Sequence, residues 1–146
     1  METNITIGVL TDPEEFCLYQ LENEYLLEIG EEPLTPEKQM RLIQAIRAGS
    51  ITYFLAKHGN CPIGMCSIAK YFSTFACTET EIFEDFYIVP AFRRKGIARK
   101  LAQAAQTWCA ANGIASLTVT CAPCDQSMYQ SLGFNTHLGI TFAYLP

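Results

Sequence analysis

A stretch in the second half of the chain constrains the fold more than any other. Residues 78–89 predict a long strand that stops at Pro90, which cannot donate to a strand ladder. A basic loop follows, and apolar residues at helical spacing run through 96–112, where Asn-Gly ends the pattern. A second β-rich run occupies 115–122. This order of strand, helix and strand predicts a parallel pair joined by a right-handed crossover.

The other patterns predict an otherwise antiparallel sheet around this pair. Runs at 51–59 and 63–72 flank an Asn-Cys-Pro turn and predict a hairpin. The packing that buries the apolar stripes is one mixed, mostly antiparallel sheet with helices on both faces, an α/β (α+β) fold in a single domain over residues 1–146. Strands are expected at 4–10, 51–59, 63–72, 78–89, 115–122, 134–138 and 140–145, and helices at 13–29, 36–48, 96–112 and 124–132.

The first two helices carry capping signals. Thr11 or Asp12 can cap the first helix, with Pro13 in its first turn. Thr35 precedes a proline in the same way in the second helix, and Gly49 lies where a helix commonly ends. These signals predict that each helix starts at its proline.

The composition is that of a globular protein with an acidic balance. Of the 146 residues, 49% are hydrophobic and 17% charged, and the net charge is −5. Nucleic-acid-binding domains are usually basic, so no nucleic-acid partner is expected. No apolar run approaches the roughly 20 residues that cross a bilayer, and the first residues do not resemble a secretory signal. We therefore expect a cytoplasmic protein without a membrane partner.

The cysteines are expected to be small buried side chains in a reducing compartment. Cys121 and Cys124 form a C-x-x-C pair between a strand and a helix, as in thioredoxin-like redox motifs, but the flanking residues and the topology differ. A thiol oxidoreductase is therefore the weaker alternative. His58 and His137 supply no second pair for zinc, and no metal is expected. The seven cysteines are Cys17, Cys61, Cys66, Cys77, Cys109, Cys121 and Cys124.

Half of the positive charge lies in eight residues. Five of the ten Lys and Arg residues lie between Arg93 and Lys100, around Gly96. A helix N-terminus presents free N–H groups and a partial positive charge, and glycine lets an anion approach the backbone. The run therefore predicts a phosphate-binding loop, with an exposed basic turn as the alternative. The G-x-G-x-x-G and G-x-x-x-x-G-K-S/T motifs are absent, which disfavours an ordinary nucleotide site.

Two motifs resemble those of the GNAT superfamily of N-acetyltransferases. The first, "IVPAFRRKGIA" at 88–98, is similar to the pyrophosphate-binding motif Q/R-x-x-G-x-G/A that follows a strand in this family. The second, "DQSMYQSLGF" at 125–134, is similar to a downstream element of the family, with Tyr129, Gly133 and Phe134 in register. The order of strands and helices matches the family over essentially the whole chain.

The resemblance implies acetyl-CoA as the co-substrate. The pantetheine arm is expected along the strand at Ile88 and Val89, with the strand after the helix splayed away from it. Arg94 stands where the family more often has Gly, and Asp125 where Asn is commoner. The contact of Asp125 with the arm is therefore open, since it can cap the short helix instead. The pyrophosphate is expected on the backbone N–H groups of Arg93, Arg94, Lys95, Gly96, Ile97 and Ala98.

The resemblance also implies direct acetyl transfer to an amine. Tyr129 is expected near the sulfur of CoA as the acid that protonates the leaving thiolate. A backbone N–H near Ile88 or Val89 is expected to bind the oxyanion. The alternative from another class is a non-catalytic acetyl-CoA-binding sensor module, against which Tyr129 argues.

The base is expected on the strand before the basic loop. Its candidates are Glu81, Glu84 and Asp85, of which Glu84 and Asp85 are the leading pair. A period of two puts Glu81 and Asp85 on one face and Glu84 on the other, whereas a bulge, common on this strand in the family, would change that parity. These carboxylates can also attract a cationic amine without taking its proton.

The sequence does not identify the acceptor. Ten of the fifteen acidic residues lie in residues 1–37, which favours a primary amine on a small molecule or a peptide. In the family, the acceptor pocket is formed by the first two helices, the loop at 31–36 and the final hairpin. Members of the family often dimerise, so a homodimer stays open.

Overall fold

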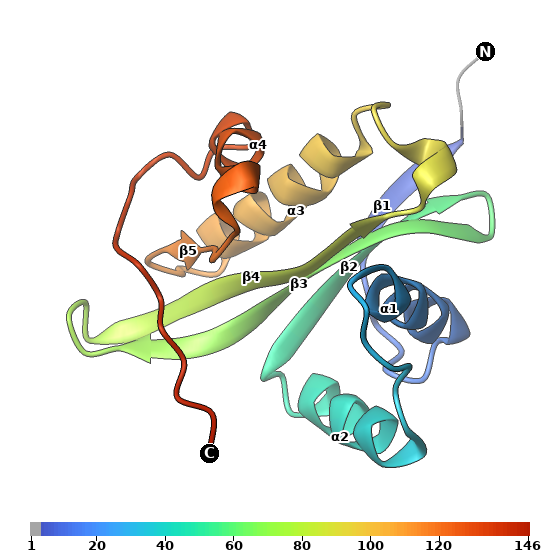
Figure 1. Cartoon of the computed structure of the whole chain (residues 1–146), viewed down its shortest axis with the longest axis horizontal. Coiled ribbons are helices and arrows are strands. Elements are labelled where there is room, and N and C mark those ends of the chain that lie inside the picture. The colour runs from blue at the N-terminus through green and yellow to red at the C-terminus, as the bar shows by residue number, and fades with distance from the viewer. Residues whose placement is uncertain (1–3) are drawn as a thin grey trace.

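The computed structural model describes residues 4–146. Five strands form one sheet in the order β1-β2-β3-β4-β5 (Figure 1). The first four pair antiparallel with their neighbours, and β5 pairs parallel with β4, as the sequence predicts. The strands are β1 (Ile5–Val9), β2 (Ile51–His58), β3 (Cys61–Ser73), β4 (Thr78–Ile88) and β5 (Leu117–Thr118).

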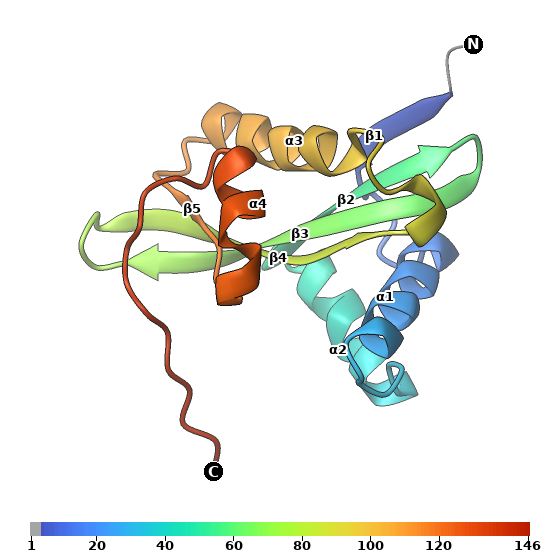
Figure 2. The ribbon, with the colours of Figure 1, turned by 45° about the horizontal axis from the view of Figure 1, so that its top comes forward.

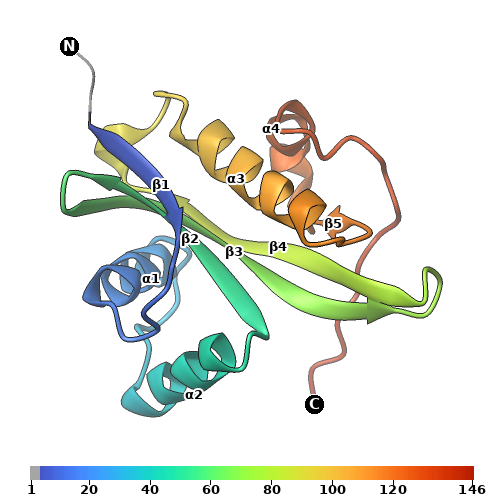
Figure 3. The ribbon, with the colours of Figure 1, turned by 180° about the vertical axis from the view of Figure 1, so that it is seen from behind.

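Helices cover both faces of this sheet. Figure 2 shows α3 on one side of the sheet and α1 and α2 on the other, and Figure 3 shows the same arrangement from behind. The predicted mixed, mostly antiparallel sheet with helices on both faces is therefore confirmed. The helices are α1 (Phe16–Glu28) and α2 (Pro36–Arg47) on one face, α3 (Ile97–Ala111) on the other, and the short α4 (Gln126–Ser131) after β5.

Each face has its own apolar core. On the α3 face, Ile97, Leu101 and Ala105 repeat every four residues and are buried against Phe54 and Phe83 of the sheet. The opposite core joins α1 and α2 to the other side chains of the same strands. Its buried members are Leu10, Leu18, Tyr19, Leu21, Ile43, Tyr53, Leu55, Met65 and Tyr87. Within residues 4–146, no helix has the length and apolar character that a membrane span requires.

The second helix begins and ends as its capping signals predict. The Thr35 hydroxyl accepts a hydrogen bond from the Lys38 N–H at 3.2 Å, and Pro36 is the first helical residue. Gly49 follows the last turn with φ +73°, a left-handed conformation that glycine adopts without strain.

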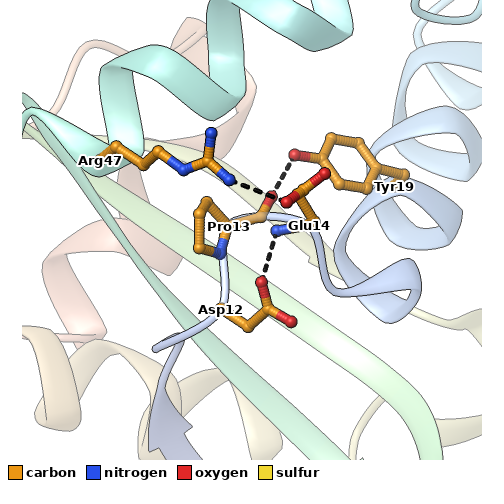
Figure 4. Close-up of polar contacts among 5 residues, drawn as sticks. All are labelled: Asp12, Pro13, Glu14, Tyr19 and Arg47. Carbon is orange, nitrogen blue, oxygen red and sulfur yellow. Dashed lines mark hydrogen bonds and ion pairs between the residues drawn. The ribbon is translucent and has the colours of Figure 1, made fainter.

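The first helix starts later than predicted. It begins at Phe16, and no side chain caps it. Instead, Asp12 accepts a hydrogen bond from the Glu14 N–H at 2.9 Å, which closes a turn before the helix (Figure 4). The Tyr19 hydroxyl donates to the carbonyl of Pro13 in this turn. The prediction that this helix starts at its proline is therefore wrong, because the aspartate side chain stabilises the competing turn.

Arg47 ties α2 to the turn that precedes α1. Its guanidinium pairs with Glu14 at 2.8 Å, as Figure 4 shows. Both side chains are more than half exposed, so we expect the pair to contribute at most about 1 kcal/mol.

The end of the chain departs from the prediction. The expected strand at 115–122 is only two residues long, and no strand forms at 134–138 or 140–145. A strand needs a ladder partner, and β5 pairs only with β4 among the described residues. The apolar side chains of this segment therefore lie in solvent, with Phe142 89% exposed.

The cysteines are only partly buried. Cys66 and Cys109 lie in the core, whereas Cys61, Cys77 and Cys124 are exposed. All seven are free thiols. The prediction of buried cysteines is therefore wrong for the exposed three, which lie in turns and at element ends rather than on an apolar stripe.

Candidate active site

A cavity opens where β4 and β5 part. Their pairing covers only Glu81 with Leu117 and Ile82 with Thr118, after which the strands diverge, as the resemblance leads one to expect. The cavity has a volume of about 510 Å³ and lies between β4, α1 and α4. Its lining consists of Tyr25, Glu28, Ile29, Ile82, Phe83, Glu84, Asp85, Phe86, Val119, Thr120, Asp125, Met128 and Tyr129.

A bulge in β4 shapes one wall of this cavity. Met65 pairs with Tyr87 but Ser67 pairs with Glu84, so β4 carries one extra residue at this point. Asp85 lies at the bulge with φ +49°, a conformation that asparagine and aspartate adopt more readily than most residues.

The bulge reverses the side-chain parity of β4. The aromatic rings of Phe83 and Phe86, three residues apart, are 5.1 Å apart, and both belong to the α3-side core. Asp85 consequently turns to the α1 side, where it contacts Tyr53. The period-two prediction that Glu81 and Asp85 share a face is therefore wrong.

Glu81 does not reach the cavity. It is 1% exposed, and neither carboxylate oxygen has a hydrogen-bond partner among the described residues. Desolvation raises the pKa of this carboxyl, with the charge of Glu79 adding to the rise. Of the three candidate bases, Glu84 and Asp85 line the cavity and Glu81 lies apart from it.

Asp85 belongs to a buried polar network. The Tyr53 hydroxyl lies 2.5 Å from Glu22 Oε1 and 3.2 Å from Asp85 Oδ2, and the Ser67 hydroxyl donates to Asp85 at 3.4 Å. Burial, then the charge of Asp85, raises the pKa of Glu22 from its usual 4.5 to about 8. Burial and the two carboxylates raise the pKa of Tyr53 well above 10.

Sequence reasoning missed Glu22. It lies four residues after Leu18 and three before Tyr25, within the apolar stripe of α1. A carboxylate at a core-facing helical position is the signal that could have identified it, because a buried Glu needs a partner.

Glu84 is the more accessible carboxylate of the cavity. Its side chain is exposed, and no ion pair within residues 4–146 includes it. Desolvation, then the neighbouring charge of Asp85, raises the pKa of Glu84.

Tyr129 projects from α4 onto an aromatic cluster. Its ring centroid lies 6.1 Å from that of Phe86 and 6.0 Å from that of Phe134. Burial raises the pKa of Tyr129 to about 12, and the charge of Asp125 adds to the rise. The phenol therefore keeps its proton at neutral pH and can act as a donor.

Asp125 lines the same cavity. It precedes α4, but its side chain makes no capping hydrogen bond. The alternative that Asp125 caps the short helix is therefore wrong, and Asp125 lines the cavity together with Tyr129.

The basic loop exposes backbone donors at the start of α3. Arg94 (φ +60°) and Gly96 (φ +82°) both adopt left-handed conformations, and the first helical bond runs from the Lys100 N–H to the Gly96 carbonyl at 3.2 Å. In the part of the chain that the structure describes, the N–H groups from 94 to 99 have no intramolecular partner. The Arg93 N–H does have one, the Pro90 carbonyl at 3.3 Å.

The Arg93 side chain links the loop to α1. Its Nε donates to the Ile88 carbonyl at 2.8 Å, and its guanidinium pairs with Glu28 at 2.6 Å. This side chain therefore fixes the loop against the cavity wall, and the backbone donors beyond it remain free for an anion.

A comparison of the sequence with family models identifies the family of the chain. A sequence model of the acetyltransferase (GNAT) family matches residues 17–134, so the chain belongs to this family. A search of curated proteins gave no match.

Solved structures share the whole fold. A probable acetyltransferase is 21% identical with a TM-score of 0.83, covering 97% of both chains. An aminoglycoside acetyltransferase from an uncultured soil metagenomic sample, crystallised with trehalose, is 15% identical with a TM-score of 0.81, covering 98% of this chain and 96% of its own. A predicted acetyltransferase from Clostridium acetobutylicum, crystallised with acetyl-CoA, is 15% identical with a TM-score of 0.80, covering 97% and 96%.

Metal ligands do not gather in the described residues. Residues 4–146 hold no group of three or more His, Cys, Asp or Glu side chains that could bind a metal ion.

Proposed function

We propose that this chain is an N-acetyltransferase that moves the acetyl group of acetyl-CoA directly to a primary amine. One observation carries the proposal: the cavity between the parted strands is lined by four acidic side chains and the neutral phenol of Tyr129, beside a helix start with free backbone donors. Membership of the acetyltransferase (GNAT) family supports it.

The helix start fits a pyrophosphate. The unpaired N–H groups at 94–99 and the positive end of the α3 dipole favour an anion. A side chain at Gly96 would project into open space, which leaves room for a ligand close to the backbone. Arg93 is not a backbone donor in this account, because its N–H is bonded to Pro90.

The oxyanion donor in this proposal is Ile88. When bound, acetyl-CoA supplies an acetyl group that its thioester activates. The Val89 N–H donates to the Ile63 carbonyl of β3 at 2.8 Å, so it is already used. Neighbouring residues of a strand direct their N–H groups to opposite edges, which turns the Ile88 N–H toward the edge that β5 has left.

Asp85 and Tyr129 supply the proton transfers. Asp85, with Glu84 beside it, takes a proton from the acceptor ammonium so that the nitrogen gains a free electron pair. Tyr129 gives its proton to the leaving sulfur, since a phenol with a pKa of about 12 is neutral at pH 7.

The acceptor in this proposal is a cationic amine on a small molecule or a peptide. Four carboxylates line the cavity, those of Glu28, Glu84, Asp85 and Asp125. No Lys, Arg or His is among its lining residues within the described chain. This field attracts ammonium groups and repels anionic acceptors.

Two measurements test the function. Acetyl-CoA should raise the melting temperature of the protein, whereas ATP at equal concentration should not. Release of free CoA should then depend on an added amine, measured over a panel of diamines, amino sugars and peptides. Binding without amine-dependent release would indicate a sensor module instead, and no response to acetyl-CoA would overturn the proposal.

A further inference from the structure

The hydroxyl of Tyr53 lies between two carboxylates. It is 2.5 Å from Glu22 Oε1 and 3.2 Å from Asp85 Oδ2. A phenol has a single proton, so it can donate to only one of them at a time. The contact with the other carboxylate is favourable only if that group carries a proton and donates to the phenol oxygen. Both contacts of the Tyr53 hydroxyl are therefore favourable when Glu22 and Asp85 together carry one proton.

The two carboxylates have different access to the cavity. Asp85 lines it, whereas Glu22 is 5% exposed and is not among the lining residues. The Tyr53 hydroxyl contacts both the accessible group and the enclosed one.

No cation compensates this pair in the described residues. The groups that face it are Tyr19 and Tyr25 from α1, Tyr53 from β2, Ser67 from β3 and Glu84 from β4. Arg47 of α2 pairs with Glu14 rather than with Glu22. The four ion pairs within residues 4–146 include neither Glu22 nor Asp85.

We propose that Glu22 and Asp85 act together as one base, in which a proton enters at Asp85 and Tyr53 passes a proton on to Glu22. This inference rests on the proposed acetyl transfer. An N–H bond of the ammonium breaks as an O–H bond forms on Asp85. Asp85 then protonates the oxygen of Tyr53 while the original phenol proton moves to Glu22. One proton is gained by the pair, and it returns to solvent by the reverse route.

The pair suits this task better than a single exposed carboxylate. A general base is most effective when its pKa lies near the working pH. Burial and the charge of Asp85 raise the pKa of Glu22 to about 8, so the doubly ionised pair binds its first proton close to neutrality. An ordinary glutamate, with a pKa near 4.5, would take the proton of an ammonium far less readily.

The first test is the pH dependence of kcat for Glu22→Gln, which keeps the size and the acceptor oxygen but cannot ionise. In the wild type, kcat should rise with pH to a plateau near pH 8. In the variant this rising limb of the profile should move to lower pH, and the plateau value of kcat should fall about 10- to 100-fold. The profile is measured with two amines of different pKa. A rise in kcat that belongs to the enzyme stays at the same pH with both amines, whereas one that belongs to the acceptor moves with the pKa of the amine. Tyr53→Phe should lower the plateau of kcat, because it removes the hydroxyl that passes the proton on to Glu22.

The matched control is Glu79→Gln, the same change on a partly exposed side chain near the start of β4, outside both the cavity and the first two helices. Its pH profile should coincide with that of the wild type. An unchanged limb and plateau in Glu22→Gln would overturn the inference.

The second test needs no turnover. In protein labelled with ¹³C at the glutamate carboxyl carbons, one resonance, missing in Glu22→Gln, should titrate near pH 8 in the wild type. If it titrates with the exposed glutamates, the shared proton is refuted. If it titrates near pH 8 but no amine yields CoA, the pair is correct and the acetyl transfer, with the base role that depends on it, is refuted.

Discussion

Gly96 shows at the residue scale why a backbone donor differs from a basic side chain. Its φ is +82°, so a side chain there would be strained, and no atom lies within 4 Å of a would-be Cβ, so the side chain would fill open space beside the helix start. We expect Gly96→Val to weaken CoA binding about 100-fold or more, from about 1–3 kcal/mol of strain and from loss of the space above the helix start.

Lys100 provides the control for this prediction. It is exposed one turn into α3 and belongs to the same basic run. We expect Lys100→Ala to change the dissociation constant of CoA by only about threefold, because exposed charges act weakly at this range. Calorimetric titration of both variants measures this, and equal losses would show that charge, not the backbone, holds the ligand.

Tyr129 tests the proton donor. The change Tyr129→Phe removes the hydroxyl but retains the ring that packs against Phe86 and Phe134. We expect kcat to fall about 100-fold while CoA affinity stays within about twofold, because only the proton for the leaving thiolate is lost. Steady-state CoA release and CoA titration measure these quantities. Turnover at the wild-type level would exclude this role.

At the scale of the element, two substitutions at the bulge of β4 distinguish the effect of the backbone conformation from the effect of the carboxylate charge. Asparagine tolerates positive φ as aspartate does, whereas a β-branched residue does not. We expect Asp85→Asn to retain the free energy of unfolding within about 1 kcal/mol but to lose most activity. Asp85→Val should lose both, with about 1–3 kcal/mol of stability from the strain at φ +49°.

Urea unfolding and CoA release, measured on both Asp85 variants, check this prediction. If Asp85→Val is as stable as Asp85→Asn, the left-handed conformation does not constrain the choice of residue. If Asp85→Asn is fully active, the carboxylate is not the group that receives the proton.

The elements differ in how far the sequence predicts them. The helix at 97–111 and the strand at 78–88 follow from periodicity within one or two residues, because their apolar faces pack on the sheet. The alternating segment at 140–145 has strand-forming residues but no ladder partner in the structure. The turn at Asp12 replaces a predicted helix start, because its side chain bonds locally.

For the whole molecule, the fold and half of the site are predictable because they depend on local patterns. The loop at 93–98, Tyr129 and the two carboxylates of β4 all come from motifs or single strands. Glu22 cannot be predicted from a local pattern, because its partner Tyr53 lies 31 residues away in the sequence and Asp85 lies on a third element. The bulge that orients Asp85 is likewise a property of the β3–β4 register, which no pattern in β4 alone determines.

The ionisable groups give the whole molecule a common pH response. Every resolved pKa shift in the described residues is upward, and burial is the largest cause for all but Lys57, whose hydrogen bond to Glu15 comes first. The groups are Tyr19, Glu22, Tyr25, Tyr53, Lys57, Cys66, Glu81, Glu84, Tyr87, Cys109 and Tyr129.

Stability should therefore fall as pH rises. Between its usual pKa of 4.5 and about 8, Glu22 is protonated in the folded chain and ionised in the unfolded one. Its contribution is fully present below pH 4.5 and is lost as pH passes 8, a change on the order of a few kcal/mol. Urea unfolding at half-unit steps from pH 5 to pH 9 should show this decline, and Glu22→Gln should flatten it. Parallel curves for the two proteins would contradict the raised pKa, because an uncharged glutamine contributes no slope in this range.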